Sequence, residues 1–402
     1  MLRFVGSGLL VAAALFAADW PQLLGPGRDG LYPDSTQGLT LRSPKLLWKK
    51  PVGAGFSGPA VVGGRLILFH RQGDKEVVES LDAKTGVRQW VFEYDTTYKD
   101  DFGFDEGPRA TPTVVGNRVY TFGAEGTLHG LELGTGKKLW RVDTQSKFSV
   151  KKGFFGAAGS PLVENGLVYL NAGGGNGAGV VALDAETGAT KWSAVNDHAS
   201  YSSPVSAVIG GAKCILFFTR EGLVAVEPLK GTLKFRYPWR SRTNASVNAA
   251  LPVVLGDRIF LTSSYNTGAV LLEIRNNVAS RVWAGDESLS AHYSTPVLKD
   301  GYLYGFHGRQ EFGQSFRCVE MNTGRVMWSE ERFGAGSVIL AGGKLIVLKE
   351  TGEAVLAAAN PKAFRVEASA TVLPRVVRSF PALAAGVLYA RNENSLVAWQ
   401  LF

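Results

Sequence analysis

Short stretches of alternating apolar and polar residues run through most of the chain, and glycine-containing turns separate them. In one example, the segment 162–164 is followed by Asn165-Gly166 and then by the alternating run 167–170. A period of two predicts strands that bury one face. The Asn-Gly pair predicts a tight hairpin, because glycine readily takes a positive φ. The pattern therefore predicts an all-β chain built from hairpins.

Two phrases repeat along these strands. The first is Leu-Asp-Ala-x-Thr-Gly followed by a tryptophan, as in 183–192, and related copies end at Trp90, Trp140 and Trp328. The second phrase marks the start of each unit, and its eight copies fall at Gly58-Pro59, Thr111-Pro112, Ser160-Pro161, Ser203-Pro204, Leu251-Pro252, Thr295-Pro296, Val338 and Phe380-Pro381. Units of about 46 residues with four antiparallel strands and one tryptophan are typical of β-propeller blades. We expect an eight-bladed β-propeller, with seven blades as the fallback.

The later units depart from this pattern in ways that predict how the ring closes. Phe235 replaces the tryptophan of the fourth unit, Asn276-Asn277 replaces Thr-Gly in the fifth, and the seventh has neither feature. The C-terminal run 380–402 supplies only three strands, whereas the Trp48 segment near the N-terminus is a last strand without a beginning. We therefore expect the Trp48 strand to complete the final blade, which would leave no open sheet edge.

The N-terminal segment has the features of a secretory signal. Arg3 supplies a positive charge, residues 4–16 are apolar, and Ala17-Ala18 precedes an abrupt change to polar sequence. The apolar run is too short to span a membrane comfortably, and it ends without a cysteine for lipid attachment. We expect a signal peptide at 1–18, an N-terminal arm at 19–43 and the propeller at 44–402. The mature protein is expected to be periplasmic or secreted, without an integral membrane span, and monomeric.

Charge and cysteine usage narrow the function classes. The formal charge is +8, but basic and acidic residues are interspersed, so a soluble basic surface is favoured over a nucleic-acid groove. Cys214 and Cys318 lie in different repeats without metal-ligand spacing. Both are predicted to be small buried residues, with a long-range disulfide as the alternative.

The Leu-Asp-Ala-x-Thr-Gly-x-x-x-Trp phrase resembles the repeat of the PQQ-like, or quinoprotein-like, β-propellers. That resemblance implies one of two function classes. One class is the pyrroloquinoline-quinone-dependent alcohol dehydrogenases, which hold a calcium-bound quinone over the propeller axis. The other is the BamB-type propellers, non-enzymatic scaffolds that assist insertion of outer-membrane β-barrels.

Departures from each class favour the scaffold. The dehydrogenases are larger and carry a vicinal cysteine pair, which Cys214 and Cys318 cannot form. The chain is BamB-like in size, although BamB proteins are typically lipoproteins and the lipidated cysteine is missing here. We therefore expect a binding or assembly scaffold with protein partners, including outer-membrane assembly components, and no cofactor. An oxidoreductase that uses PQQ with calcium is the alternative.

A candidate ligand site follows from the repeat register. The residues three positions before each marker proline, or at the equivalent position, should rim the central channel; they are Phe56, Arg109, Ala158, Tyr201, Ala249, Tyr293, Ala335 and Arg378. Two arginines among aromatics predict a pocket for an anionic or aromatic ligand. The alternative is that these side chains plug the channel. His198 and His292 lie near this rim, and hydrogen bonding is favoured there over metal ligation.

Three other patterns in the sequence bear on function. The acidic run contains Asp100, Asp101, Asp105 and Glu106, which are weak calcium candidates because their spacing does not match an EF-hand. A solvated loop, or one pinned by Arg109, is favoured, so no metal site is predicted. No nucleophile elbow is present outside the signal segment, and no catalytic residues are predicted. Trp239 beside Arg240 and Arg242 supports a third class, a polysaccharide-binding module.

Overall fold

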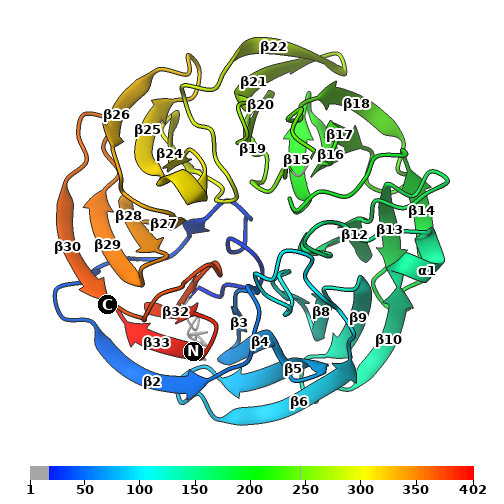
Figure 1. Ribbon diagram of the computed structural model, residues 1–402, viewed down its shortest axis with the longest axis horizontal. Coiled ribbons are helices and arrows are strands. Elements are labelled where there is room, and N and C mark those ends of the chain that lie inside the picture. The colour runs from blue at the N-terminus through cyan, green and yellow to red at the C-terminus, as the bar shows by residue number, and fades with distance from the viewer. Residues whose placement is uncertain (1–17, 245) are drawn as a thin grey trace, which may run out of the picture.

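The protein is a disk of eight β-sheets arranged in a ring (Figure 1). The computed structural model describes residues 18–244 and 246–402, so nearly all of the predicted signal peptide lies outside the described residues. Seven sheets have four strands, and the eighth has a fifth strand contributed by the N-terminal segment. The predicted all-β, eight-bladed propeller is therefore confirmed.

The first four blades follow the chain in order, from the centre of the ring outward. Blade 1 consists of β3 (Ala60–Val62), β4 (Arg65–Gln72), β5 (Lys75–Asp82) and β6 (Arg88–Asp95). Blade 2 consists of β7 (Thr113–Val115), β8 (Arg118–Phe122), β9 (Thr127–Glu132) and β10 (Lys138–Asp143). Blade 3 consists of β11 (Leu162–Glu164), β12 (Leu167–Asn171), β13 (Val180–Asp184) and β14 (Thr190–Ala194). Blade 4 consists of β15 (Val205–Ile209), β16 (Ala212–Phe218), β17 (Gly222–Val226) and β18 (Leu233–Pro238).

The remaining blades include both chain ends. Blade 5 consists of β19 (Val253–Leu255), β20 (Arg258–Ser263), β21 (Gly268–Arg275) and β22 (Val278–Gly285). Blade 6 consists of β23 (Val297–Lys299), β24 (Tyr302–His307), β25 (Ser315–Glu320) and β26 (Val326–Glu330). Blade 7 consists of β27 (Gly336–Ala341), β28 (Lys344–Lys349), β29 (Glu353–Ala358) and β30 (Val366–Thr371), with β1 (Leu31–Tyr32) parallel to β27. Blade 8 consists of β31 (Ala382–Ala384), β32 (Val387–Arg391), β33 (Ser395–Gln400) and β2 (Lys45–Pro51).

The repeated Asp-x-x-Thr-Gly phrase forms the turn between the third and fourth strands. In blade 1 the Asp82 carboxylate accepts hydrogen bonds from the backbone N–H and the hydroxyl of Thr85, both at 2.8 Å. Gly86 then takes a φ of +71° and donates its N–H to the carbonyl of Asp82. The aspartate thus organises the turn, and the glycine supplies the left-handed conformation that it needs.

Each repeated tryptophan docks onto the turn of the next blade. The Trp90 indole Nε1 donates to the carbonyl of Leu133 at 2.9 Å, and a Cβ on Gly136 would lie 2.5 Å from the Trp90 ring. The same indole-to-carbonyl bond recurs at five further junctions, Trp48–Ala83, Trp140–Ala185, Trp192–Pro228, Trp283–Met321 and Trp328–Asn360. Glycine in the turn is therefore required by close packing as well as by φ, and each tryptophan packs between neighbouring sheets.

The degenerate units keep the blade geometry with other residues. Phe235 pairs with Ala225 in the register in which Trp192 pairs with Ala182, and it is 5% exposed. A phenyl ring fills the position but has no N–H to donate. Asn276 and Asn277 take φ values of +51° and +62°, which suits a two-residue hairpin turn.

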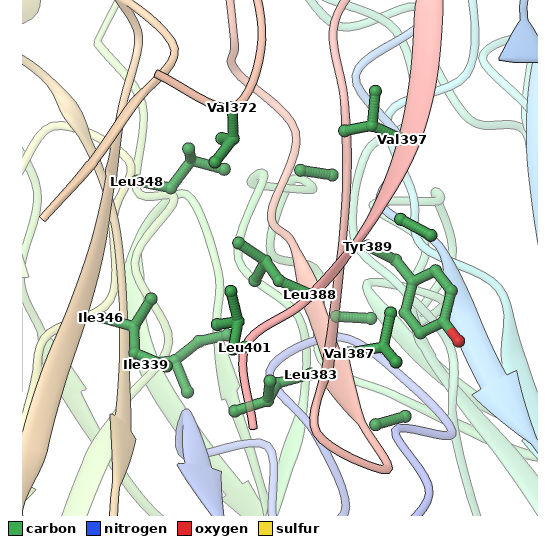
Figure 2. Packing of buried hydrophobic residues seen from close by; sticks show 14 of the residues in the cluster. Ile339, Ile346, Leu348, Val372, Leu383, Val387, Leu388, Tyr389, Val397 and Leu401 are labelled. Carbon is green, nitrogen blue, oxygen red and sulfur yellow. The ribbon is translucent and has the colours of Figure 1, made fainter. Parts of the chain in front are cut away.

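Blade 8 joins the two ends of the chain, as predicted. Trp48 of β2 lies on the antiparallel ladder with β33. Figure 2 shows Leu388 and Leu401 pointing toward Ile339 and Ile346 of blade 7, while Tyr389 points to the opposite side. The Tyr389 hydroxyl donates to a blade 1 carbonyl, that of Ala83, at 3.2 Å. Alternate residues of one strand thus pack against both neighbouring blades, which closes the ring.

The N-terminal segment crosses the face of the disk that carries the Thr-Gly turns, which we call the arm face. The segment passes near the centre of the disk (Figure 1), and Trp20 on it is 1% exposed and bridged to Val61. Arg28 is 4% exposed, and its guanidinium donates to the carbonyls of Ser160, Pro161 and Pro204. These carbonyls lead into blades 3 and 4, so the N-terminal segment contacts two blades that lie more than 130 residues further along the chain.

Arg28 is a buried cation with neutral partners only. Its Nε donates to the Gln22 side chain at 2.9 Å, and its Nη1 donates to Pro204 at 2.7 Å. Among the described residues it makes no ion pair. Burial lowers the pKa of Arg28 to about 9, which leaves it charged at neutral pH. A buried charge is tolerated here because its donors are satisfied by carbonyl and amide oxygens.

Candidate functional site

The opposite face of the disk, the mouth face, carries the connections from each outer strand to the next inner strand. The segments 96–112 and 144–161 are the longest of these connections. They contact each other, because Lys152 donates to the carbonyl of Lys99 at 2.7 Å and the rings of Phe102 and Phe155 are 5.1 Å apart. The two connections therefore form one continuous structure over blades 1 to 3.

The structure brings four of the predicted rim residues together at the channel mouth. The guanidiniums of Arg109 and Arg378 lie 5.7 and 5.6 Å from the Phe56 ring. The Glu350 carboxylate accepts hydrogen bonds from Arg378 at 3.2 Å and from the Tyr293 hydroxyl at 2.8 Å. Burial raises the pKa of Tyr293 well above its usual value, and the charge of Glu350 adds to this effect. These side chains are occupied mainly with one another.

The other predicted rim residues have separate partners. The Tyr201 hydroxyl accepts the Phe155 N–H at 2.9 Å. His292 Nε2 lies 2.8 Å from the Tyr265 hydroxyl, and burial lowers the pKa of His292 to about 4, so the ring is neutral at pH 7. His198 is mostly exposed, with Nδ1 2.8 Å from Glu221. The two histidines therefore have hydrogen-bonding partners of their own.

The acidic run is tied to the fold by individual contacts. Asp100 accepts the Phe104 N–H at 2.6 Å, and its carboxylate lies 3.7 Å from Arg109. The others also have protein partners: Asp101 pairs with Lys152, Asp105 accepts from Gly55 and Gly107, and Glu106 pairs with Arg71 and Lys99. Within residues 18–244 and 246–402, no group of three or more His, Cys, Asp or Glu residues is placed to hold a metal ion. The contacts are those of a loop pinned by Arg109.

A cavity of about 470 Å³ opens on the mouth face among blades 2, 3 and 4. Its lining includes the predicted residues Ala158, His198 and Tyr201. It also includes four cations that the repeat register did not identify, Lys151, Lys152, Arg220 and Arg240. The run Lys151-Lys152-Gly153-Phe154-Phe155, basic and then aromatic, was the available sequence signal.

Four aromatic side chains, two of them exposed and two partly buried, lie at or beside this cavity. We define the aromatic patch as Phe102, Phe104, Phe154 and Phe155. Phe102 and Phe104 are 49% and 55% exposed, and their rings lie 6.3 Å apart. The Phe104 ring is 5.8 Å from the Arg378 guanidinium, which joins the patch to the channel mouth. Sequence reasoning treated this segment as acidic and missed its aromatic character.

Residues that bear on the alternative functions lie elsewhere. Cys214 and Cys318 are both free and buried, on β16 and β25 of different blades, so the prediction of small buried residues is confirmed. The Trp239 ring packs against the core of blades 4 and 5, and its Nε1 donates to Gly268 at 3.3 Å. No helix in the described part of the chain is long and apolar enough to cross a membrane.

Known proteins similar to this chain fall into two groups. The outer membrane protein assembly factor BamB of Yersinia pestis is 23% identical over 305 residues, which are 72% of this chain and 72% of that protein. A quinohemoprotein alcohol dehydrogenase of Comamonas testosteroni is 33% identical over 141 residues, but these are only 19% of the enzyme and 33% of this chain.

Solved structures from both groups resemble this chain at the level of fold. The crystal structure of BamB from Moraxella catarrhalis has a TM-score of 0.60 at 15% identity, covering 89% of this chain and 98% of that one. The quinohemoprotein alcohol dehydrogenase of C. testosteroni has a TM-score of 0.66 at 14% identity, covering 95% and 80%. A family model described as outer membrane protein assembly factor BamB matches residues 95–330. Because that match spans more than half of the sequence, the chain belongs to the BamB family of PQQ-like β-propellers.

Proposed function

We propose that the protein is a periplasmic, non-enzymatic scaffold in outer-membrane protein assembly, and that it acts by docking a protein of the assembly apparatus. Membership of the BamB family supports the role, since the family description names outer-membrane protein assembly. The signal-like segment at the N-terminus supports export. The observation that carries the proposal is the aromatic patch on the mouth face.

The patch has the properties of an anchor for a protein partner. Exposed aromatic groups that gather in one place mark interaction sites more often than scattered ones do, and aromatic side chains dominate the binding energy of protein interfaces. Phe102 and Phe104 stand on a short loop whose backbone N–H groups are bound by Asp100. Because the loop is pinned before binding, little conformational entropy is lost when a partner docks.

The predicted mouth residues have a supporting role in this proposal. Arg109 lies 3.7 Å from the Asp100 carboxylate, and Arg378 lies between Phe56 and Phe104. Tyr201 holds Phe155 of the same patch through its backbone N–H. These residues therefore act as the frame that presents the patch.

The test is the doubly substituted variant Phe102→Ser, Phe104→Ser in cells that lack the native gene. We expect the variant to fold with an unchanged melting temperature, because both side chains are about half exposed and exposed substitutions change stability by about 0.5 kcal/mol or less. The level of folded outer-membrane β-barrels should fall toward that of the deletion strain, and co-purification with assembly components should be lost.

A matched control is Val91→Ser, which removes an apolar side chain of similar exposure (43%) from the outer strand β6. The control should restore barrel levels fully. Normal barrel levels with the doubly substituted variant, or an equal defect with Val91→Ser, would contradict the proposed role of the patch.

The match to alcohol dehydrogenases makes an oxidoreductase the second candidate. The residues at the mouth do not fit a calcium-bound quinone well: the cysteines lie in different blades, and each carboxylate of the acidic run already has a protein partner. Mixing the purified protein with pyrroloquinoline quinone and calcium should therefore give neither a stoichiometric quinone absorbance nor dye-linked alcohol oxidation. Turnover in that assay would replace the scaffold proposal.

A further inference from the structure

The cavity among blades 2, 3 and 4 lies to one side of the channel mouth. Its 470 Å³ is within the range of small-molecule sites in proteins, about 300 to 1,000 Å³. One wall comes from the loop 150–159 and the other from the entry to blade 4 and the loops around Arg220 and Arg240. Neither the family description nor the proposed docking patch assigns this cavity a role.

Cations outnumber anions in the cavity lining. The lining holds Lys151, Lys152, Arg220 and Arg240 against only two carboxylates, those of Asp101 and Glu125. The Glu125 carboxylate is already bound by three groups of Thr96 and Thr97, at 2.7 to 3.1 Å. The Asp101 carboxylate is paired with Lys152. Lys151, Arg220 and Arg240 therefore have no carboxylate partner within the lining.

Groups next to the cavity compensate these three cations only in part. Glu221 lies 3.9 Å from Arg240 but is engaged by His198 at 2.8 Å. Among the described residues Lys151 makes no ion pair. Arg220 donates to the carbonyls of Ser246, at 3.0 Å, and Asn244, both of which are neutral.

The Arg220 side chain is also held in a fixed orientation. Its guanidinium lies 5.4 Å from the centre of the Phe154 ring, and carbonyls hold its Nη groups. Burial lowers the pKa of Arg220, and the charge of Arg240 adds to that effect. Both guanidiniums line the same cavity, so an anion bound there would be attracted by both charges.

Apolar and small residues complete the lining. Phe122, Val150, Phe154 and the ring of Tyr201 offer apolar surface, and glycines and alanines at 156–159 and 172–173 leave the space open. A charged group bound by the cations could therefore carry an apolar body that packs against the aromatic rings.

We propose that this cavity binds a small oxyanion, a phosphate or carboxylate carried on a compact apolar body, with Lys151, Arg220 and Arg240 contacting the charged group. The site is off the channel axis and does not depend on the proposed scaffold role. Arginine pairs well with planar or tetrahedral oxyanions because its fork of donors matches their oxygens. A neutral ligand would add no charge to balance the three cations.

The test is isothermal titration calorimetry of the purified mature chain with four probes: phenyl phosphate, benzoate, inorganic phosphate and benzyl alcohol. We expect saturable one-to-one binding of phenyl phosphate or benzoate, weaker binding of inorganic phosphate, and none of benzyl alcohol. Comparing phenyl phosphate with benzoate distinguishes a phosphate ligand from a carboxylate ligand. Binding should weaken as salt is added, since the attraction is partly electrostatic.

Three variants and one control locate the site. Lys151→Ala and Arg240→Gln should each weaken the better probe about tenfold, the effect of losing roughly one charge-assisted contact. Ala199→Trp keeps every charge but fills the cavity from an exposed position in its lining, and it should abolish binding. Arg242→Gln removes an exposed cation two residues from Arg240 and outside the lining, so it should bind like the wild type.

The outcomes separate a built site from a generally basic surface. The proposal would be overturned if Arg242→Gln lost as much affinity for the probe as Arg240→Gln, or if Ala199→Trp bound the probe like the wild type. It would also be overturned if neither phenyl phosphate nor benzoate showed saturable binding at millimolar concentration. None of these outcomes bears on outer-membrane assembly. The scaffold proposal is tested separately by the doubly substituted variant Phe102→Ser, Phe104→Ser. Neither of these two phenylalanines lines the cavity.

Discussion

The two faces of the disk use arginine in opposite ways. On the arm face, Arg28 is 4% exposed and donates to backbone carbonyls of blades 3 and 4 without an ion-pair partner among the described residues. On the mouth face, Arg378 is paired with Glu350 and remains partly exposed. Arg220 and Arg240 line an open cavity on that face. The arm face thus uses a charge to hold blades together, whereas the mouth face keeps charges within reach of ligands.

This difference follows from what each face must do. A propeller closes by packing each blade on its neighbours, and the indole-to-glycine contacts of this chain lie on the arm-face side of the blades. Structure on that side is repeated and buried. The long connections 96–112 and 144–161 lie on the mouth face, where length and composition are free to vary. Stability should therefore depend mainly on the arm face, and binding on the mouth face.

The largest expected effect is that of Arg28→Met. The substitution leaves the carbonyls of Ser160, Pro161 and Pro204 without their donor, and a buried unsatisfied acceptor costs about 1 to 3 kcal/mol. We expect the free energy of unfolding to fall by about 3 kcal/mol. Urea unfolding should show a lower midpoint at an unchanged slope.

The control for this variant is Arg141→Met, which alters a half-exposed arginine of β10. It should change the free energy of unfolding by about 0.5 kcal/mol or less. If both variants were destabilised equally, the buried Arg28 would stabilise the fold no more than an exposed arginine does. The proposed difference between the two faces would then be wrong.

The second prediction concerns acid and a buried histidine. His129 is 1% exposed, its ring lies 4.4 Å from that of Tyr94, and burial lowers its pKa to about 3, with Arg141 and Lys138 adding to the shift. The unfolded chain takes up this proton near pH 6.5, so below that pH the unfolded state binds a proton that the folded state does not. This group should lower the free energy of unfolding by about 1.4 kcal/mol for each pH unit below about 6.5, which gives a loss of about 2 kcal/mol at pH 5.

Urea unfolding between pH 7 and pH 5 tests the acid prediction. His129→Gln should remove this share of the pH dependence, whereas His198→Gln on the mouth face should not, because His198 is mostly exposed and pairs with Glu221. Identical pH profiles for the wild type and His129→Gln would contradict the prediction, because they would mean that burial does not keep His129 unprotonated in the folded state.

Local sequence predicted the fold because each blade docks through local residues. The tryptophan and the Thr-Gly turn both belong to the repeated phrase, and the indole-to-carbonyl bond of Trp90 recurs at five further junctions. The incomplete C-terminal unit likewise predicted closure by the Trp48 strand. The Arg28 brace was not predictable, since Gly27-Arg28-Asp29 reads as an ordinary turn and its acceptors lie in blades 3 and 4.

The sequence predicted rim residues only where they occupy equivalent positions in successive blades. Equivalent positions in successive blades fall on one circle, which is why Phe56, Arg109, Tyr293 and Arg378 meet. Glu350, which pairs with two of them, lies in a turn without a repeated phrase. The residues of the patch and the cavity lie in connections without periodicity, and the available signal was the basic and then aromatic run 151–155.

The smallest effect should come from the ion pair between Glu350 and Arg378, and it sharpens the contrast between the faces. The carboxylate accepts from Arg378 at 3.2 Å, but both side chains are partly exposed, so water can solvate either charge after its partner is removed. A double-mutant cycle of Glu350→Gln and Arg378→Gln, followed by urea unfolding, should give a coupling energy of about 0.5 to 1 kcal/mol. The ion pair on the mouth face would then contribute less to the free energy of unfolding than the unpaired Arg28 on the arm face. The reason is that burial of the side chain, and not its pairing with an opposite charge, sets the loss of stability on substitution. A coupling energy of about 3 kcal/mol or more would show that the mouth face is built as rigidly as the arm face, and the division of labour between the two faces would have to be abandoned.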